Sequence, residues 1–561
     1  MISLAFYGKI RYSVLILIYS SFAYNSVQVF HCKNYDKLRL EEIGLFSKAF
    51  SGGILGLEGY IVSIEADVSE GLPGFSMVGY LASEVKEAQD RVRTALKNSG
   101  FRLQAKKVTV NLSPADIRKE GTAYDLPIAV AVLGAYGVLE PEVLKHSLLI
   151  GELGLDGEIK AVRGILSIVS AAKGAGFSRC FLPEENVMEG SVIQGIQVIG
   201  VSHILEVTEL LNNPAELEKR NARPKIKPIF PVTRNRADFS DVHGQLLFKR
   251  ATEIAVAGRH NILYIGMAGI GKTMIAQRIP TIMPDLTPEE RLEISKVYSI
   301  CGLLPHETPL LSERPFRTPH HTISQQALTG GGRYPRPGEL SLASEGVLFL
   351  DEFPEFKRST IEALRQPLEE HKITVTRLHG SYVFPADFLL AAAMNPCPCG
   401  FFPDRSRCSC SEWQIKRYLG KISKPLLDRI DICVESSPVS FEDLNGEQKE
   451  ECSDRIKERV IKAQVIQQKR FVGSGILFNS RMNGQQIKRY CTLAPEDETF
   501  IKKIFETMKL SVRGYNKILK VARTIADLSG EENIGHEHLC EAIAYRSLDE
   551  KYWGGSTYGR T

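Results

Sequence analysis

From about Phe46 onward, the spacing of apolar residues indicates a folded domain in which strands and helices are mixed. The segments GYIVSIEADV and KKVTVNLSP alternate between apolar and polar residues, as half-buried strands do. Three further segments have the apolar spacing of helices and end near a glycine, a common helix terminator: residues 82–100, 125–137 and 166–177. We therefore predict an N-terminal α/β domain over residues 45–213.

The α/β pattern stops at a segment rich in proline and charge, and then resumes. We predict a linker over residues 214–240, because the sequence there has little periodicity. A second α/β block follows over residues 241–435, and residues 436–561 are mostly helical in pattern. A chain of 561 residues is too long for a single core, so three folded regions agree with its length.

Residues 1–44 do not share this pattern, and three interpretations are open. Lys9 and Arg11 precede the apolar run VLILIY, which loosely resembles a secretory signal but is too short to span a bilayer. Alternatively, translation starts at Leu45, because the codons for Leu40-Glu41-Glu42 can contain a ribosome-binding sequence and Leu45 can be a TTG start. The third interpretation is a genuine extension. We expect a non-native or disordered segment.

Composition places the chain among ordinary soluble proteins. Apolar residues make up 43% and charged residues 24%, and the net charge of +4 neither requires nor excludes a nucleic-acid partner. The 11 cysteines are an odd number and are mostly scattered singly, which argues against a secreted disulfide framework. We expect a cytoplasmic protein without a membrane segment.

The second block contains a phosphate-binding pattern. A short apolar strand leads into GMAGIGKT, and a helical pattern follows, which is the strand–loop–helix setting of G-x-x-x-x-G-K-[ST]. The loop amides would surround the phosphates, Lys272 would supply charge, and the Thr273 hydroxyl would bind Mg²⁺. The residues expected to bind nucleotide are Gly266, Met267, Ala268, Gly269, Ile270, Gly271, Lys272 and Thr273.

A second apolar strand, GVLFL, ends in two acidic residues. Asp351 would complete the Mg²⁺ shell, and Glu352 would polarise the attacking water. The next segment, residues 359–371, predicts one helix in which Ser359 and Glu362 have the spacing of a capping box. These motifs together predict hydrolysis of a nucleoside triphosphate, with ATP and Mg²⁺ in the site.

Three further polar residues fit the same chemistry. The strand DFLLAAAM ends at Asn395, and we expect it beside the Asp-Glu strand, where the amide can hold water or sense the γ-phosphate. Arg429 follows KPLLD, and Arg513 lies at a predicted helix start. One arginine acting from a neighbouring subunit and one from the C-terminal region would match arginine-finger catalysis.

Longer segments in all three regions match one known family. They are VNLSPADIRKEGTAYDLPIA, GELGLDGEIKAVRG, DVHGQ, FRTPHHTIS, NPCPCG, LLDRID and VARTIADL. From Leu45 to about Tyr545 the chain resembles the magnesium-chelatase-like AAA+ ATPases of the ComM/YifB family. The resemblance implies a bacterial homo-hexamer that hydrolyses ATP and binds single-stranded or branched DNA. Met267-Ala268 replaces the usual Pro-Pro of the family, so nucleotide affinity is expected to differ.

The resemblance also implies a fold class. It is α/β, with an N-terminal Lon-protease/ribosomal-S5-like domain, an AAA+ P-loop domain and a C-terminal helical lid. The serine of a Lon-type peptidase aligns with Ala123, and its lysine falls near Leu166, so no protease dyad is expected. Lys119 and Lys160 are expected to be surface charges. The N-terminal domain should be a scaffold or a DNA-handling module.

Four cysteines follow Asn395 directly. Cys397, Cys399, Cys408 and Cys410 form C-x-C-x₈-C-x-C. Four thiolates can hold a structural Zn²⁺ ion, and the alternative is four free thiols. The loop between them is poor in apolar residues, so a metal would fix it near the γ-phosphate sensor. We expect structural zinc without a catalytic part.

Two stretches could contact DNA. HKITVTRLHGSYVFP alternates like a hairpin, and in related hexameric helicases a hairpin at this place lines the pore. TGGGRYPRPGEL is an insert rich in glycine and proline. The candidates for phosphate contact are Arg333, Arg336, Lys372, Arg377 and His379, and the alternative is that they are solvated charges. His320 and His321 are expected to be loop or interface residues rather than metal ligands.

Functions from different classes fit these features. The leading one is a ring ATPase that moves DNA strands, as a branch-migration helicase does in recombination or natural transformation. The alternative is a chelatase-type or chaperone-like ATPase that remodels a protein partner. The N-terminal domain argues against the chelatase, whose ATPase subunit is expected to lack it. A protease-associated unfoldase is disfavoured by the missing serine.

Overall fold

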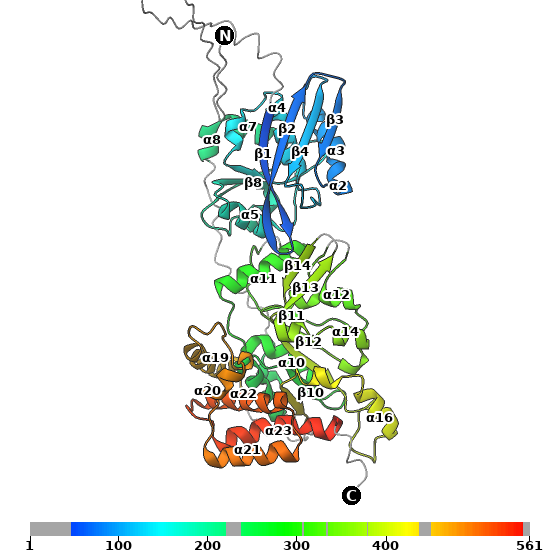
Figure 1. Ribbon diagram of the computed structural model, residues 1–561, viewed down its shortest axis with the longest axis vertical. Helices are drawn as coiled ribbons and strands as arrows, with labels where there is room; N and C mark the ends of the chain where they lie inside the picture. The colour runs from blue at the N-terminus through cyan, green and yellow to red at the C-terminus, as the bar shows by residue number, and fades with distance from the viewer. Residues whose placement is uncertain are drawn as a thin grey trace, which may run out of the picture. The chain divides into compact units, whose positions relative to one another are not determined.

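The computed structural model describes residues 46–219, 237–305, 308–332, 335–377, 380–436 and 450–553. These residues form an N-terminal α/β block, a second α/β block and a set of C-terminal helices (Figure 1). The predicted α/β class is confirmed. No helix among the described residues is both long and apolar enough to cross a membrane.

The N-terminal block is built on a seven-stranded mixed sheet with the order β3-β4-β2-β1-β5-β8-β9. Its strands are β1 (Phe46–Leu55), β2 (Glu58–Ser69), β3 (Gly74–Val78), β4 (Lys107–Ser113), β5 (Ser147–Leu149), β8 (Arg179–Pro183) and β9 (Gln197–Val201). The predicted strands are β2 and β4, which pair antiparallel. A separate two-stranded ribbon joins β6 (Glu152–Leu153) and β7 (Ile159–Lys160).

Helices complete this block. The longer ones are α3 (Ala88–Asn98), α4 (Asp125–Ala135), α5 (Ile165–Gly174) and α7 (Ile204–Asn212), and short turns are α2 (Ser83–Lys86) and α6 (Val187–Gly190). All residues of α4 are buried, which agrees with its apolar sequence on every side. The predicted helices are confirmed, although the first is interrupted at Glu87. The predicted linker begins with a helix, α8 (Pro214–Lys219), in which Leu217 packs into the domain core.

Lys119 is not a surface charge. It is fully buried, because its backbone pairs with the chain at Tyr80 and Ala82. Its ammonium donates a 2.9 Å hydrogen bond to the carbonyl of Ile117. Burial lowers the pKa of Lys119. Lys160 is exposed, as predicted.

The second block has a five-stranded parallel sheet with the order β11-β12-β15-β10-β16. The strands are β10 (Ile262–Ile265), β11 (Phe316–Arg317), β12 (Val347–Leu350), β15 (Leu389–Met394) and β16 (Ile432–Glu435). Almost all residues of the four longer strands are buried, as is typical of a parallel sheet covered on both faces. The predicted pairing of the Asn395 strand, β15, with the Asp-Glu strand, β12, is confirmed.

Helices of the second block are mostly short. They are α9 (Leu246–Gly258), α10 (Lys272–Ile282), α11 (Pro288–Cys301), α12 (Gln325–Thr329), α13 (Glu339–Leu342), α14 (Arg358–Glu362), α15 (Pro367–Glu370), α16 (Glu412–Leu419) and α17 (Lys424–Leu427). The predicted hairpin is present as β13 (Lys372–Arg377) and β14 (Gly380–Pro385).

The single helix predicted over residues 359–371 is wrong. The structure divides it into α14 and α15, because Pro367 has no N–H for a continuous helix and its ring clashes with the preceding turn. Lys357 is the N-cap of α14, so Ser359 and Glu362 form no capping box. Glu362 instead pairs with Arg365 at 3.2 Å.

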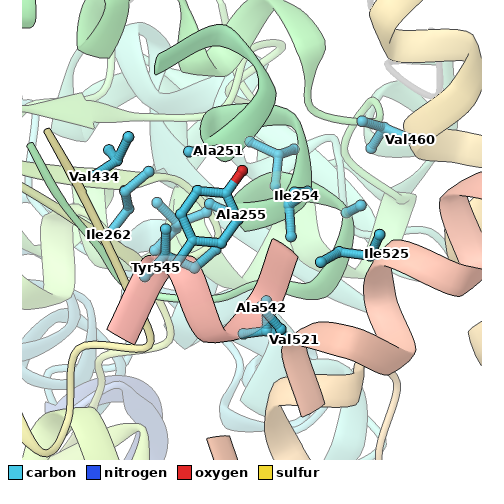
Figure 2. Close-up of a cluster of buried hydrophobic side chains, with 14 of the residues drawn as sticks. Ala251, Ile254, Ala255, Ile262, Val434, Val460, Val521, Ile525, Ala542 and Tyr545 are labelled. Carbon is cyan, nitrogen blue, oxygen red and sulfur yellow. The ribbon is translucent and has the colours of Figure 1, made fainter. Parts of the chain in front are cut away.

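The C-terminal helices share a core with the second block (Figure 2). They are α19 (Ser453–Arg470), α20 (Gly484–Tyr490), α21 (Pro495–Thr507), α22 (Val512–Ser529) and α23 (His536–Trp553). Ala251 and Ile254 of α9 lie between strand residues such as Ile262 and the lid residues Val460 and Ile525. Helix α9 therefore connects the lid to the sheet that carries the candidate site.

Candidate functional site

A cavity of about 380 Å³ lies at the carboxyl edge of the parallel sheet. Its lining combines the three predicted motifs: Ala268, Gly269, Ile270, Gly271, Lys272, Thr273, Met274, Asp351, Glu352, Met394 and Asn395. Strands β10, β12 and β15 are parallel neighbours, so the residues that follow them meet at one edge. The sheet order thus assembles the cavity from segments far apart in the sequence.

The loop after β10 requires its glycines. Gly269 and Gly271 have φ values of +79° and +92°, in the left-handed region that side chains disfavour. A Cβ on Gly266 would lie 2.4 Å from the Ser436 hydroxyl. Gly271 is the N-cap of α10, so the unpaired amides and the positive end of this helix lie at the cavity. The arrangement can hold an anionic phosphate.

Lys272 is held at the base of the cavity. Its ammonium donates to the carbonyls of Gly266 and Met267 at 2.7 and 2.8 Å, and to Asn395 Oδ1 at 3.1 Å. Burial lowers the pKa of Lys272 to about 8, although the Asp351 carboxylate opposes this shift. A phosphate group would supply the negative charge that this partly buried cation lacks.

Asp351 and Thr273 form a pair at the opposite wall. The Thr273 hydroxyl donates to Asp351 Oδ2 at 2.7 Å, and the other carboxylate oxygen accepts the Glu352 amide at 2.9 Å. A carboxylate and a hydroxyl side by side are the oxygen ligands that Mg²⁺ takes in phosphate sites. These residues fit the predicted cation.

Glu352 has a partner that the sequence analysis missed. Its carboxylate Oε2 lies 3.2 Å from His321 Nδ1, and the His321 ring contacts the His320 ring, with centroids 4.1 Å apart and the planes tilted by 34°. His321 follows β11, the edge strand beside β12, so the sheet brings it to the end of the Asp-Glu strand. Glu352 has a φ of +51°, unusual outside glycine. The sequence held no local signal for this contact, because it depends on the order of the strands.

Arg429 and Arg513 do not line the cavity of their own chain. Both contact one carboxylate oxygen, Oε1 of Glu369 in α15, at 2.7 Å from Arg429 Nη2 and 3.7 Å from Arg513 Nη2. Arg429 also donates to the Arg365 carbonyl at 2.9 Å. Among the described residues that form the cavity, no arginine is present. The two predicted arginines are together, but at another surface.

The four predicted cysteines converge. The sulfur of Cys397 lies 3.3 Å from that of Cys399 and 3.8 Å from that of Cys408, and all four sulfurs lie within 4.8 Å of one another. Tetrahedral thiolates around an ion at about 2.3 Å would be separated by about 3.8 Å. Burial opposes ionisation of Cys399, but the Phe401 amide and neighbouring thiols outweigh it and lower its pKa to about 6. The cluster could hold a metal ion.

Three of the predicted DNA contacts are described. Arg336, Lys372 and Arg377 are exposed, and Arg377 Nε donates to the Gly332 carbonyl at 3.2 Å, which joins the hairpin to the insert. Arg333 and His379 lie outside the described residues.

The cysteine cluster yields a prediction about metal content. We expect purified protein to contain about one thiolate-bound ion per chain, and the Cys399→Ser/Cys408→Ser variant to lose it because only two sulfurs remain. The Tm should also fall by several degrees, since the loop has little apolar surface to fold it. Mass spectrometry of metals and thermal unfolding measure both effects.

Cys540→Ser, which changes an exposed cysteine outside the cluster, is the matched control and should retain the ion. Wild-type protein prepared without chelators that carries no metal would contradict the prediction.

Comparisons with known families cover most of the chain. A family model described as magnesium chelatase, subunit ChlI, matches residues 238–444. A second model, described as the C-terminal part of subunit ChlI, matches residues 450–546. A model described as subunit ChlI of Mg-chelatase matches residues 64–186. The N-terminal domain therefore does not separate this chain from chelatase-type proteins, contrary to the expectation from the sequence.

Two individual proteins match over nearly their whole length, and a third matches over a shorter part. Competence protein ComM of Haemophilus influenzae is 41% identical over 502 residues, which is 89% of this chain and 97% of that protein. YifB of Escherichia coli is 40% identical over 501 residues, or 88% and 96% of the two chains. DNA repair protein RadA of Halalkalibacterium halodurans is 32% identical over 114 residues, or 20% and 24%. The chain therefore belongs to the ComM/YifB family of magnesium-chelatase-like AAA+ ATPases.

Proposed function

We propose that the protein is a homo-hexameric ATP-driven motor that acts on single-stranded or branched DNA in the cytoplasm, as a branch-migration helicase in recombination or natural transformation. The observation that carries the proposal is the separation of the cavity from Arg429 and Arg513. None of the described residues that line the cavity is an arginine, and a ring would supply one from the neighbouring protomer at every interface.

The cavity residues have distinct roles in this proposal. The 266–273 loop and Lys272 bind the β- and γ-phosphates, and Thr273 and Asp351 hold Mg²⁺. When bound, Mg²⁺ neutralises charge on the phosphate oxygens. Glu352 accepts a proton from the attacking water, and Asn395, already bonded to Lys272, senses the γ-phosphate.

The arginines act in trans. In the single chain Glu369 holds Arg429 and Arg513 at one surface. Against a neighbouring protomer, the negative γ-phosphate competes with Glu369 for these cations, and the arginines stabilise charge in the transition state. Hydrolysis is thereby coupled to contact between protomers.

DNA is the proposed substrate of the motor for two reasons. The relatives named above include a competence protein and, over a shorter part, a DNA repair protein. The exposed cations Arg336, Lys372 and Arg377 would contact phosphates without reading sequence. The cysteine cluster would hold Zn²⁺ as a structural ion and keep the loop after Asn395 in place.

The first prediction from this proposal concerns the stimulus for hydrolysis. Forked or four-way-junction DNA should raise the steady-state ATPase rate several-fold, because DNA aligns the protomers whose arginines complete each cavity. Lys272→Ala should abolish both basal and stimulated rates, since the phosphate loses its cation. Stimulation by an unfolded protein, with none by DNA, would instead support the remodelling function of a chelatase-type ATPase.

The second prediction concerns His321. His321→Ala should raise the basal kcat with KM unchanged, because the imidazole no longer restrains the Glu352 carboxylate through the 3.2 Å contact. His321→Asn places an amide donor where Nδ1 lies and should behave like wild type.

Glu352→Gln should lower kcat by about 100-fold or more, as the loss of a general base does. The proposal that His321 restrains Glu352 is wrong if His321→Ala has the wild-type kcat. It is also wrong if the kcat of His321→Asn differs from wild type as much as that of His321→Ala.

A further inference from the structure

Helix α16 and the cysteine loop before it present an unusual surface. Trp413 in α16 is one of only two tryptophans in the chain, and its side chain is 66% exposed. Tryptophan is large and is highly buried on average, so this exposure is unusual for the residue type. The Phe401 ring is partly exposed on the loop. We name the set Phe401, Arg405, Arg407, Trp413, Lys416 and Arg417 the aromatic–arginine surface.

Guanidinium groups lie against both rings. Arg417 Cζ is 5.1 Å from the centroid of the Trp413 ring, and Arg407 Cζ is 4.4 Å from that of Phe401. These cation–π contacts hold flat, positively charged groups beside flat apolar groups. Arg405 donates to the Cys410 carbonyl at 3.3 Å, so the loop itself orders part of the surface.

The charge of this segment is only partly neutralised: hydrogen bonds from Ser406 and the charge of Arg407 lower the pKa of the Asp404 carboxyl. Residues 401–421 contain five basic and two acidic side chains, whereas the whole chain has a net charge of only +4. No carboxylate among the described residues lies within 4.0 Å of a cationic nitrogen of Arg405, Arg407, Lys416 or Arg417. By contrast, Lys421 pairs with Glu355 at 3.0 Å. Asp404 accepts hydrogen bonds from the Ser406 amide and hydroxyl.

We infer that the aromatic–arginine surface binds single-stranded nucleic acid. Bases would stack on Trp413 and Phe401, and phosphates would contact the unpaired cations, which is the combination that holds single strands without sequence preference. An acidic protein would use the charges but not the exposed ring faces. This inference rests on the proposed function, because it assumes that the protein binds DNA. It adds a second contact site for DNA, separate from the β13–β14 hairpin.

The loop that carries Phe401 and Arg407 begins next to the nucleotide cavity. Asn395 lies two residues before Cys397, and a Cβ on Gly400 would be 4.0 Å from the amide of Ala268 in the phosphate loop. The segment that carries Phe401 and Arg407 therefore begins beside the γ-phosphate sensor. A strand bound there would be close enough to respond to the state of the nucleotide.

Binding at this surface can be followed by the fluorescence of Trp413 itself. The second tryptophan, Trp553, donates to the Leu419 carbonyl of α16 at 3.1 Å, and the Trp553→Phe variant leaves Trp413 as the single tryptophan; its circular dichroism should match that of wild type. In the full-length Trp553→Phe protein, an oligothymidylate of about 20 nucleotides should quench the Trp413 fluorescence, because a stacked base lies on the ring. The affinity should fall as salt rises, since phosphates are neutralised by the cations.

Variants then test the surface by fluorescence anisotropy with labelled oligothymidylate. Trp413→Ala should weaken binding about fivefold or more, the loss expected for one stacked base. Arg407→Ala/Arg417→Ala should weaken it and reduce the salt dependence, and Trp413→Phe should bind much better than Trp413→Ala. Arg93→Ala/Lys97→Ala, which removes two exposed cations one turn apart on α3, is the matched control and should bind like wild type.

The outcomes separate this inference from the proposed function. If wild-type protein binds no DNA, the proposed function fails. If wild-type protein binds but Trp413 is not quenched and the variants bind equally well, the aromatic–arginine surface is not a nucleic-acid site. If mass photometry shows that the variants lose binding only because they no longer assemble, the surface contacts a neighbouring subunit, and the inference is also wrong.

Discussion

The hydrogen bond between Lys272 and Asn395 joins the two halves of the candidate site. It exists because β15 lies between β10 and β12, so that an amide at the end of one strand meets the lysine beyond its neighbour at 3.1 Å. The same order places Asp351 against Thr273. Parallel strands buried on both faces leave little freedom at their carboxyl ends, and the sheet thus fixes the geometry of the groups that would hold a phosphate and its cation.

The ion pairs of Glu369 hold Arg429 and Arg513 at a surface apart from the cavity. The described residues that line the cavity include a lysine, two carboxylates and an amide, but no arginine. In the proposed mechanism the two arginines are the groups that this cavity still needs for fast phosphoryl transfer. The core in Figure 2 matters here, because α22, which carries Arg513, packs with α9 and the sheet. Helix α22 therefore shares one core with the sheet that carries the site.

The sequence was sufficient to predict those parts of the site that directly follow buried strands. An apolar run followed at once by a glycine loop, by Asp351-Glu352 or by Asn395 is a local signal, and the cysteine spacing is another. His321 and Glu369 could not be found in this way, because their contacts depend on strand order and on how α15 packs. The burial of Lys119 depends likewise on a backbone pairing with Leu81 that periodicity does not reveal. Pro367 was a local signal against a continuous helix, and the prediction of one helix over residues 359–371 did not take it into account.

The most direct measurement is the ATPase activity of mixed variants. Lys272→Ala and Arg429→Ala proteins, each inactive alone, should regain activity when mixed, because an intact cavity of one meets the intact arginine of the other. A mixture of Lys272→Ala and Glu352→Gln should stay inactive, since both changes damage the cavity of their own chain. Failure of the first mixture to recover in rings shown to contain both variants, or full activity of Arg429→Ala alone, would contradict a site shared between protomers.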